Sequence, residues 1–116
     1  MDKKLMSIST SMMVLRLLET RDMYGYQVIK ALEEASNQVF CLKEGTLYPI
    51  LHNLETEGCI EGYEQVTDTG RIRKYYKITK DGKVKLDQKQ REWDTYQKAV
   101  NQVMGGDAYA QILFGF

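Results

Sequence analysis

The side chains best suited to specific recognition of another molecule lie between residues 45 and 57. Apolar residues recur there at i, i+3, i+4 and i+7, the spacing of a helix with one core-facing stripe: Leu47, Ile50, Leu51 and Leu54. The other positions offer hydroxyl, imidazole and amide groups able to bond base edges or phosphates: Thr46, Tyr48, Pro49, His52 and Asn53. Asn53 is the expected base reader, because a side-chain amide bonds N6 and N7 of adenine bidentately. Exposed polar residues occur on many helices, so this set needs support from elsewhere in the chain.

The ends of this helix are marked by three residues. Pro49 fits the first turn, where no backbone donor is required, if Thr46 is the N-cap. Gly58 suits the position just after the last turn. We therefore expect the helix over residues 45–57.

The remaining periodicity predicts two helices before this segment, and a hairpin and a long helix after it. Asp22 is the expected N-cap of the second helix, and Thr79 that of the last. The expected elements are helices at 7–19, 22–35, 45–57 and 80–104, and strands at 63–66 and 72–78. This order is typical of a mainly α fold with a small β-hairpin, the winged helix-turn-helix. It divides the chain into a DNA-binding domain (1–79), a dimerisation helix (80–104) and an apolar tail (105–116).

The charge distribution favours a polyanionic partner. The whole chain has 16 cationic and 16 anionic side chains, yet residues 71–91 contain nine Lys or Arg and only two Asp. A basic stripe of this kind attracts DNA phosphates, although charge alone leaves a merely solvated face open. Cations beside the hairpin tip are expected to reach phosphate or the minor groove: Arg71, Arg73 and Lys74. Tyr24 and Lys43 complete the expected contacts to a double-stranded DNA operator.

The last helix has a heptad pattern. Leu86, Trp93 and Val100 lie seven residues apart, and Tyr96 and Val103 occupy the d positions between them. An amphipathic helix on so small a domain finds its simplest partner in a second copy, so these five residues are the expected homodimer interface. Packing of the helix onto its own domain is the alternative.

Composition excludes several other classes. With 116 residues, 43% hydrophobic and 28% charged, the chain fits one globular domain. The apolar run at 12–15 stops at Arg16, so no membrane segment or signal peptide is expected. A single histidine with Cys41 and Cys59 cannot form a structural zinc site, so neither metal nor cofactor is expected. The thiols are expected to be buried or inert in a reducing cytoplasm, with oxidant sensing left open. No Ser/His/Asp grouping, phosphate-binding glycine loop or pair of acids placed for a cleft points to an enzyme.

Several sequence blocks together resemble the PadR family of bacterial transcriptional regulators. They are Tyr24-Gly25-Tyr26, Gly45-Thr46-Leu47-Tyr48-Pro49-Ile50-Leu51, Leu54-Glu55-Thr56-Glu57-Gly58, Gly70-Arg71, and Lys74-Tyr75-Tyr76-Lys77-Ile78-Thr79-Lys80-Asp81-Gly82, in that order. The resemblance implies a homodimeric repressor in which the C-terminal helix forms the dimer and an effector often loosens DNA binding.

The single long C-terminal helix resembles a smaller subfamily, some members of which hold flat aromatic compounds at the dimer interface. That resemblance implies a planar aromatic effector beside Trp93 and Gln97, with Leu5, Ile8 and Met12 of the first helix on the facing side. The alternative is that Trp93 is only a packed seam residue. A winged helix that contacts an acidic protein instead of DNA is the main rival for the function as a whole.

Overall fold

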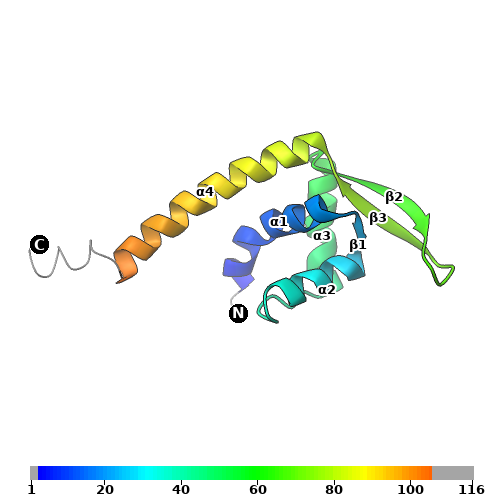
Figure 1. Ribbon diagram of the computed structural model, residues 1–116, viewed down its shortest axis with the longest axis horizontal. Coiled ribbons are helices and arrows are strands. Elements are labelled where there is room, and N and C mark those ends of the chain that lie inside the picture. Colours follow the sequence, from blue (N-terminus) through cyan, green and yellow to red (C-terminus); the bar gives the residue numbers. More distant parts are fainter. Residues whose placement is uncertain (1–2, 106–116) are drawn as a thin grey trace, which may run out of the picture. The chain divides into compact units, whose positions relative to one another are not determined.

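The computed structural model describes the backbone of residues 3–105 and the side chains of residues 9–105. Its elements are α1 (Lys3–Thr20), β1 (Met23–Tyr24), α2 (Gly25–Ala35), α3 (Glu44–Thr56), β2 (Ile60–Val66), β3 (Ile72–Ile78) and α4 (Lys80–Gly105), shown in Figure 1. The mainly α winged helix-turn-helix with a long C-terminal helix is therefore confirmed. The expected apolar tail, apart from its first residue Gly105, lies outside the residues that the structure describes.

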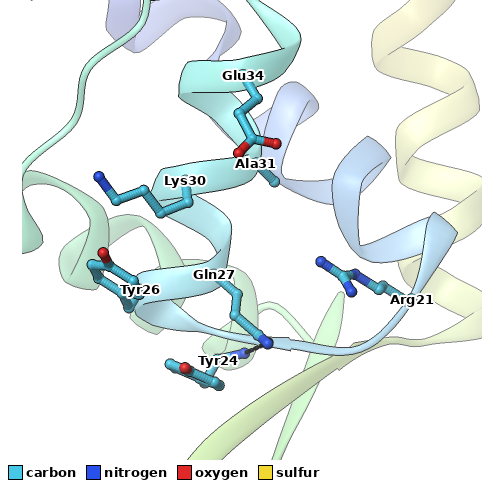
Figure 2. Close-up of a pocket in the computed structure, with 7 residues that line it drawn as sticks. All are labelled: Arg21, Tyr24, Tyr26, Gln27, Lys30, Ala31 and Glu34. Atoms are coloured by element: carbon cyan, nitrogen blue, oxygen red, sulfur yellow. Dashed lines mark hydrogen bonds between the residues drawn. The ribbon is translucent and has the colours of Figure 1, made fainter.

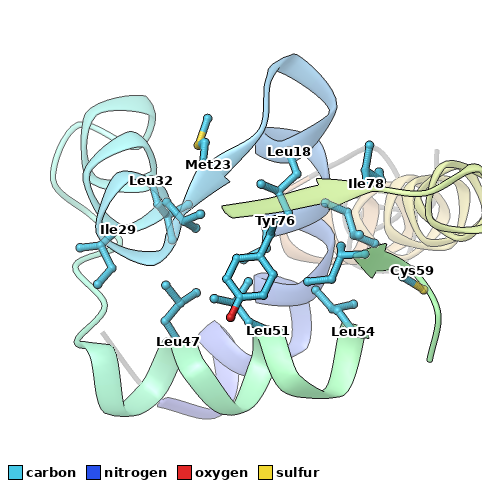
Figure 3. Packing of buried hydrophobic residues seen from close by; sticks show 14 of the residues in the cluster. Leu18, Met23, Ile29, Leu32, Leu47, Leu51, Leu54, Cys59, Tyr76 and Ile78 are labelled. Atoms are coloured by element: carbon cyan, nitrogen blue, oxygen red, sulfur yellow. The ribbon is translucent and has the colours of Figure 1, made fainter. Parts of the chain in front are cut away.

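The hydrophobic core lies between the three helices and the inner face of the sheet. Leu47, Leu51 and Leu54 are at most 2% exposed and point from α3 toward Tyr76 and Ile78 of β3, as Figure 3 shows. The predicted stripe of α3 is thus confirmed, except that Ile50 is only partly buried. This packing holds one side of α3 on the body and leaves the opposite side open.

The sheet has three antiparallel strands in the order β1-β3-β2. The hairpin prediction is confirmed for β3, but β2 starts three residues earlier than expected, and β1 was not expected at all. Met23 pairs with Tyr76 and Tyr24 pairs with Tyr75, so this two-residue strand ties the start of α2 to the centre of the sheet. Asp22 therefore precedes β1 and is not the N-cap of α2, a position that Tyr24 occupies.

The boundaries of α3 also differ slightly from the expectation. Its N-cap is Lys43 in extended conformation, not Thr46, whose backbone N–H already donates to the Lys43 carbonyl at 3.0 Å. Pro49 consequently lies one turn into the helix. Gly58 follows the C-cap with a φ of 77°, as predicted for the residue that ends the helix.

The start of α4 is bonded to the segment that follows α3. As predicted, Thr79 is the N-cap of α4: its Oγ1 accepts from the N–H of Gly82 at 3.0 Å. The same hydroxyl donates to the carbonyl oxygen of Gly58 at 2.6 Å, and the N–H of Thr79 donates to the carbonyl oxygen of Cys59 at 3.0 Å. A Cβ at residue 82 would collide with the Cys59 carbonyl oxygen, so only glycine allows this approach. We call this set of contacts the α4 junction.

The chain divides into two compact units, residues 1–86 and 87–116. Leu86, expected to open the coiled-coil seam, is instead 1% exposed in the core of the first unit. Its heptad position coincides with the stretch of α4 that is still packed on the winged helix, so the seam cannot start there. The described part of the second unit is the remainder of α4.

Candidate nucleic-acid interface

The open side of α3 carries all five residues that the sequence predicts as DNA contacts on this helix. Thr46, Pro49, His52 and Asn53 are exposed, and Tyr48 is 45% exposed. They lie opposite the buried leucines, so the scaffold holds the base-reading candidates on a packed, rigid helix. Their contact with DNA stays a prediction, as it does for the exposed Lys43 just before the helix.

Tyr48 also forms part of the contact between α2 and α3. A Cβ at Gly25 would lie 2.8 Å from the Tyr48 hydroxyl oxygen, so the phenol rests directly on the first residue of α2. The Tyr24 N–H, one residue earlier, donates to Oε1 of Gln27 at 3.2 Å. The exposed face of α3 and the first turn of α2 therefore form one continuous surface.

A row of aromatic rings crosses the outer face of the sheet. The ring centroids of Tyr24 and Tyr75 are 5.3 Å apart in an edge-on arrangement, and those of Tyr75 and Tyr63 are 5.9 Å apart and stacked. The Arg73 guanidinium carbon lies 5.5 Å from the centroid of the Tyr24 ring, within cation–π range. This row connects Arg73 of the hairpin with the start of α2. It was missed in the sequence because β1, which supplies Tyr24, is too short to show periodicity.

One end of this row is fixed by a short hydrogen bond. The Tyr63 hydroxyl donates to Oδ2 of Asp22 at 2.5 Å. This bond to the carboxylate raises the pKa of Tyr63 to about 12. The phenol therefore stays protonated throughout the physiological range and fastens β2 to the residue before β1.

Lys74 lies on the opposite, inner face of the hairpin. Its Nζ donates to Oε1 of Glu55 on α3 at 3.1 Å and lies 5.3 Å from the Tyr76 ring centroid. The hydrogen bond to Glu55 raises the pKa of Lys74. The pair crosses β2 at Gly62, where a Cβ would meet both side chains. Lys74 thus points back toward α3, whereas Arg71 and Arg73 are exposed at the tip. Its expected contact with phosphate stays untested.

A pocket beside the first turns of α2 contains two cations, Arg21 and Lys30, that the sequence pattern did not predict as part of the site. Arg21, Tyr24, Tyr26 and Lys30 line it, as Figure 2 shows. Nζ of Lys30 lies 5.5 Å from the Tyr26 ring centroid and 3.4 Å from Oε2 of Glu33. The signal available in the sequence was the spacing of Tyr26 and Lys30, which puts both on one helix face.

The second unit presents apolar side chains along its described helix. Tyr96 is 60% exposed, Val100 39% and Val103 65%, and Trp93 is partly buried with its ring centroid 6.2 Å from that of Tyr96. Three of the expected interface residues, Tyr96, Val100 and Val103, are therefore exposed in the single chain, and Trp93 is only partly exposed. Gln97 is also exposed on this helix.

The expected effector site is described only in part. The side chains of Leu5 and Ile8 lie outside the described residues, and Met12 is partly buried against the core of the first unit. Among the described residues, no three His, Cys, Asp or Glu side chains are grouped to hold a metal ion. None of the helices described here is long and apolar enough to span a membrane.

Comparisons with known proteins agree on one family. A family model described as the transcriptional regulator PadR-like family matches residues 14–88. An uncharacterized protein of Lysinibacillus sphaericus is 36% identical over 93 residues, covering 80% of this chain and 85% of its own. The transcriptional regulator Rv3488 of Mycobacterium tuberculosis is 32% identical over 77 residues, covering 66% of this chain and 68% of its own.

Solved structures give the same answer. A transcriptional regulator from Clostridium thermocellum superposes with a TM-score of 0.81 at 30% identity, covering 88% of this chain and 99% of that one. A PadR-like transcriptional regulator from Bacillus cereus gives 0.79 at 26% identity, covering 90% and 100% of the two chains.

Proposed function

Because the chain belongs to the PadR-like family of transcriptional regulators, we propose that it acts in the cytoplasm as a homodimer that represses transcription from a specific double-stranded DNA site. The observation that carries this proposal is the open side of α3, where Thr46, His52 and Asn53 are exposed opposite three buried leucines. Such a helix inserts into a major groove and reads base edges there.

The hairpin supplies the contacts to the backbone. Arg71 and Arg73 are exposed at its tip, and the cation–π contact with Tyr24 orients Arg73 beside the start of α2. Phosphate contacts of this kind position the protein on DNA and make its affinity fall steeply with salt.

Dimerisation through α4 is favoured by three exposed apolar side chains, Tyr96, Val100 and Val103. Together with the partly buried Trp93 they follow a heptad spacing, which is the pattern of a helix that packs against a partner helix. Two recognition helices fixed by such a dimer read half-sites about 34 Å apart, one turn of DNA.

A planar aromatic compound is the proposed effector, and Trp93 and Gln97 are its proposed contacts on α4. The α4 junction supports a route for its action, because Thr79, the N-cap of α4, is bonded to Gly58 and Cys59 just after the C-cap of α3. An effector that prefers one dimer geometry then alters the spacing of the recognition helices.

A gel-shift assay against the DNA upstream of the protein's own coding region, repeated over a range of salt concentrations, tests the proposal. We expect salt-dependent binding by a dimer, and relaxed base preference in Asn53→Ala. Arg71→Ala should instead weaken all sequences alike and flatten the salt dependence. A protein that is monomeric at micromolar concentration, or that retains no duplex at low salt, contradicts the proposal. Quenching of Trp93 fluorescence by a panel of flat aromatic compounds tests the effector.

A further inference from the structure

The strand β2 forms one edge of the sheet. In the strand order β1-β3-β2 it pairs with β3 on one side, and no strand within residues 3–105 pairs with it on the other (Figure 1). The strand runs over Ile60–Val66, and most of its side chains are exposed. A long edge strand with free backbone groups is a template for pairing with a further strand. The free side of β2 is therefore a candidate interface.

Alternate residues of β2 point their backbone groups toward this free side. In an antiparallel ladder, residues bonded to the neighbouring strand alternate with residues that are not. Just beyond one end of β2, the N–H of Thr67 donates to the carbonyl oxygen of Arg71 at 2.7 Å. Just before its other end, the carbonyl oxygen of Cys59 accepts from the N–H of Thr79 at 3.0 Å. The odd-numbered residues of β2 are thus bonded to β3, and the backbone groups of the even-numbered ones face outward: Ile60, Gly62, Glu64 and Val66.

The strand is self-complementary about Tyr63. When a second copy of β2 lies antiparallel to the first with Tyr63 opposite Tyr63, the outward-facing residues meet one another along the whole strand. Ile60 then lies opposite Val66, which is 60% exposed at the end of the hairpin, so each end of the pairing has an apolar pair. Glu61 lies opposite Gln65, so no two like charges face each other there.

The remaining pair brings a carboxylate to a lysine. Glu64 of one copy lies opposite Gly62 of the other, and Lys74 fills the space above that glycine, because its Nζ would lie 3.1 Å from a Cβ at Gly62. Glu64 therefore meets the ammonium group that Glu55 already holds at 3.1 Å. A shift of the register by two residues instead brings Glu64 opposite Glu64 in one direction, and leaves both hairpin ends unpaired in the other. Charge and length of pairing thus favour the same register.

We propose that the free side of β2 is an interface for a second copy of this chain, paired antiparallel about Tyr63. The pairing joins two sheets into one and takes no residue from α4, so it links two α4 dimers. Val66 of each copy lies beside Ile60 of the other, a residue only 1% exposed in the core of its own chain, so neither hairpin is free to approach DNA. Self-association therefore competes with operator binding. This competition, unlike the pairing itself, rests on the proposed function.

Cysteine cross-linking tests the register. Tyr63→Cys, made in a Cys41→Ser background because Cys41 is exposed, places two thiols opposite each other at a non-hydrogen-bonded pair, where side chains are closest. Gln65→Cys in the same background is the matched control, because it lies on the same face of the strand but opposite Glu61. We expect mild oxidation to link Tyr63→Cys alone, with both variants folded by circular dichroism. Equal linking of both variants, or of neither, overturns the register.

Sedimentation from micromolar to near-millimolar protein measures the association itself. We expect the mass of the wild-type species to double with rising concentration. Glu64→Pro removes an outward N–H without touching the bonds to β3, and should abolish the doubling. Glu64→Ala keeps that N–H and should weaken association by no more than about fivefold, as for the loss of an exposed ion pair. A constant wild-type mass, or a doubling that persists in Glu64→Pro, overturns the interface.

Two further results separate the interface from the proposed function. Tyr96→Glu introduces a charge into the α4 seam and should still show a doubling; loss of the doubling would overturn the assignment to β2. Oxidised Tyr63→Cys should lose DNA binding and regain it on reduction, and unchanged binding after oxidation overturns the competition. If neither the wild type nor the reduced variant binds any duplex, the proposed function and the competition both fail, while the cross-link still decides the pairing.

Discussion

The substitution Gly82→Ala is expected to destabilise the fold, although alanine is the better helix former. Gly82 lies in the first turn of α4 and is buried. An added Cβ would collide with the Cys59 carbonyl oxygen and lie 2.8 Å from Cγ1 of Ile78. The obstacle is largely backbone, so it cannot be relieved by rotating a flexible side chain.

Three contributions decide whether Gly82→Ala raises or lowers the free energy of unfolding. Replacing glycine by alanine within a helix stabilises by about 1 kcal/mol. Overpacking costs about 1–3 kcal/mol, and displacing α4 weakens the Thr79 hydrogen bonds to Gly58 and Cys59, worth about 1 kcal/mol each. We expect a net loss of about 2 kcal/mol, which lowers the melting temperature by roughly 10 °C.

Urea denaturation followed by circular dichroism, at one fixed protomer concentration, measures this loss. Gly45→Ala is the matched control. Gly45 is also in the first turn of a helix, but a Cβ there meets no atom within 4 Å, so this variant should be neutral or more stable by up to about 1 kcal/mol. If Gly82→Ala unfolds at the same urea concentration as the wild type, or at a higher one, the close packing at the α4 junction is refuted.

Three further predictions concern the contacts around the site. A double-mutant cycle of Lys74→Met and Glu55→Gln should give a coupling of about 0.2–1 kcal/mol in urea denaturation, as for a partly exposed ion pair; zero coupling would mean that the pair is not formed. Asp22→Asn should lower the pKa of Tyr63 from about 12 toward its ordinary value of 10. Since folding raises this pKa, the stability that the hydrogen bond contributes is complete below pH 10 and is lost as pH rises toward 12. Tyrosinate absorbance, with Tyr63→Phe as reference, measures the pKa in the wild type and in Asp22→Asn. An unshifted titration in Asp22→Asn would contradict the hydrogen bond. Tyr96→Glu should weaken the dimer by about 100-fold, because it introduces a charge into an apolar seam; sedimentation that finds an unchanged dimer would exclude this seam.

The sequence predicted the structure best where a residue pattern has a single structural explanation. The leucine stripe of α3 had to be buried, so its polar remainder had to be exposed, and the structure agrees. Thr79 and Gly58 were recognisable because caps depend on local chemistry at a single residue.

Longer-range pairing was not recoverable in the same way. The strand Met23–Tyr24 has no periodicity of its own and exists only because β3 offers it an edge. Leu86 fits a heptad and a core equally well by spacing, and only the fold decides for the core. The bond between Lys74 and Glu55 depends on space above Gly62, which spacing along the chain does not reveal.

The two cysteines give the protein an internal probe of local opening. Cys41 is exposed between α2 and α3, whereas Cys59 is 4% exposed and its carbonyl receives the Thr79 N–H. An alkylating reagent can reach the buried thiol only when the surrounding elements separate. The ratio of the two modification rates therefore reports how often the structure around Cys59 opens locally, without an added label or a substitution.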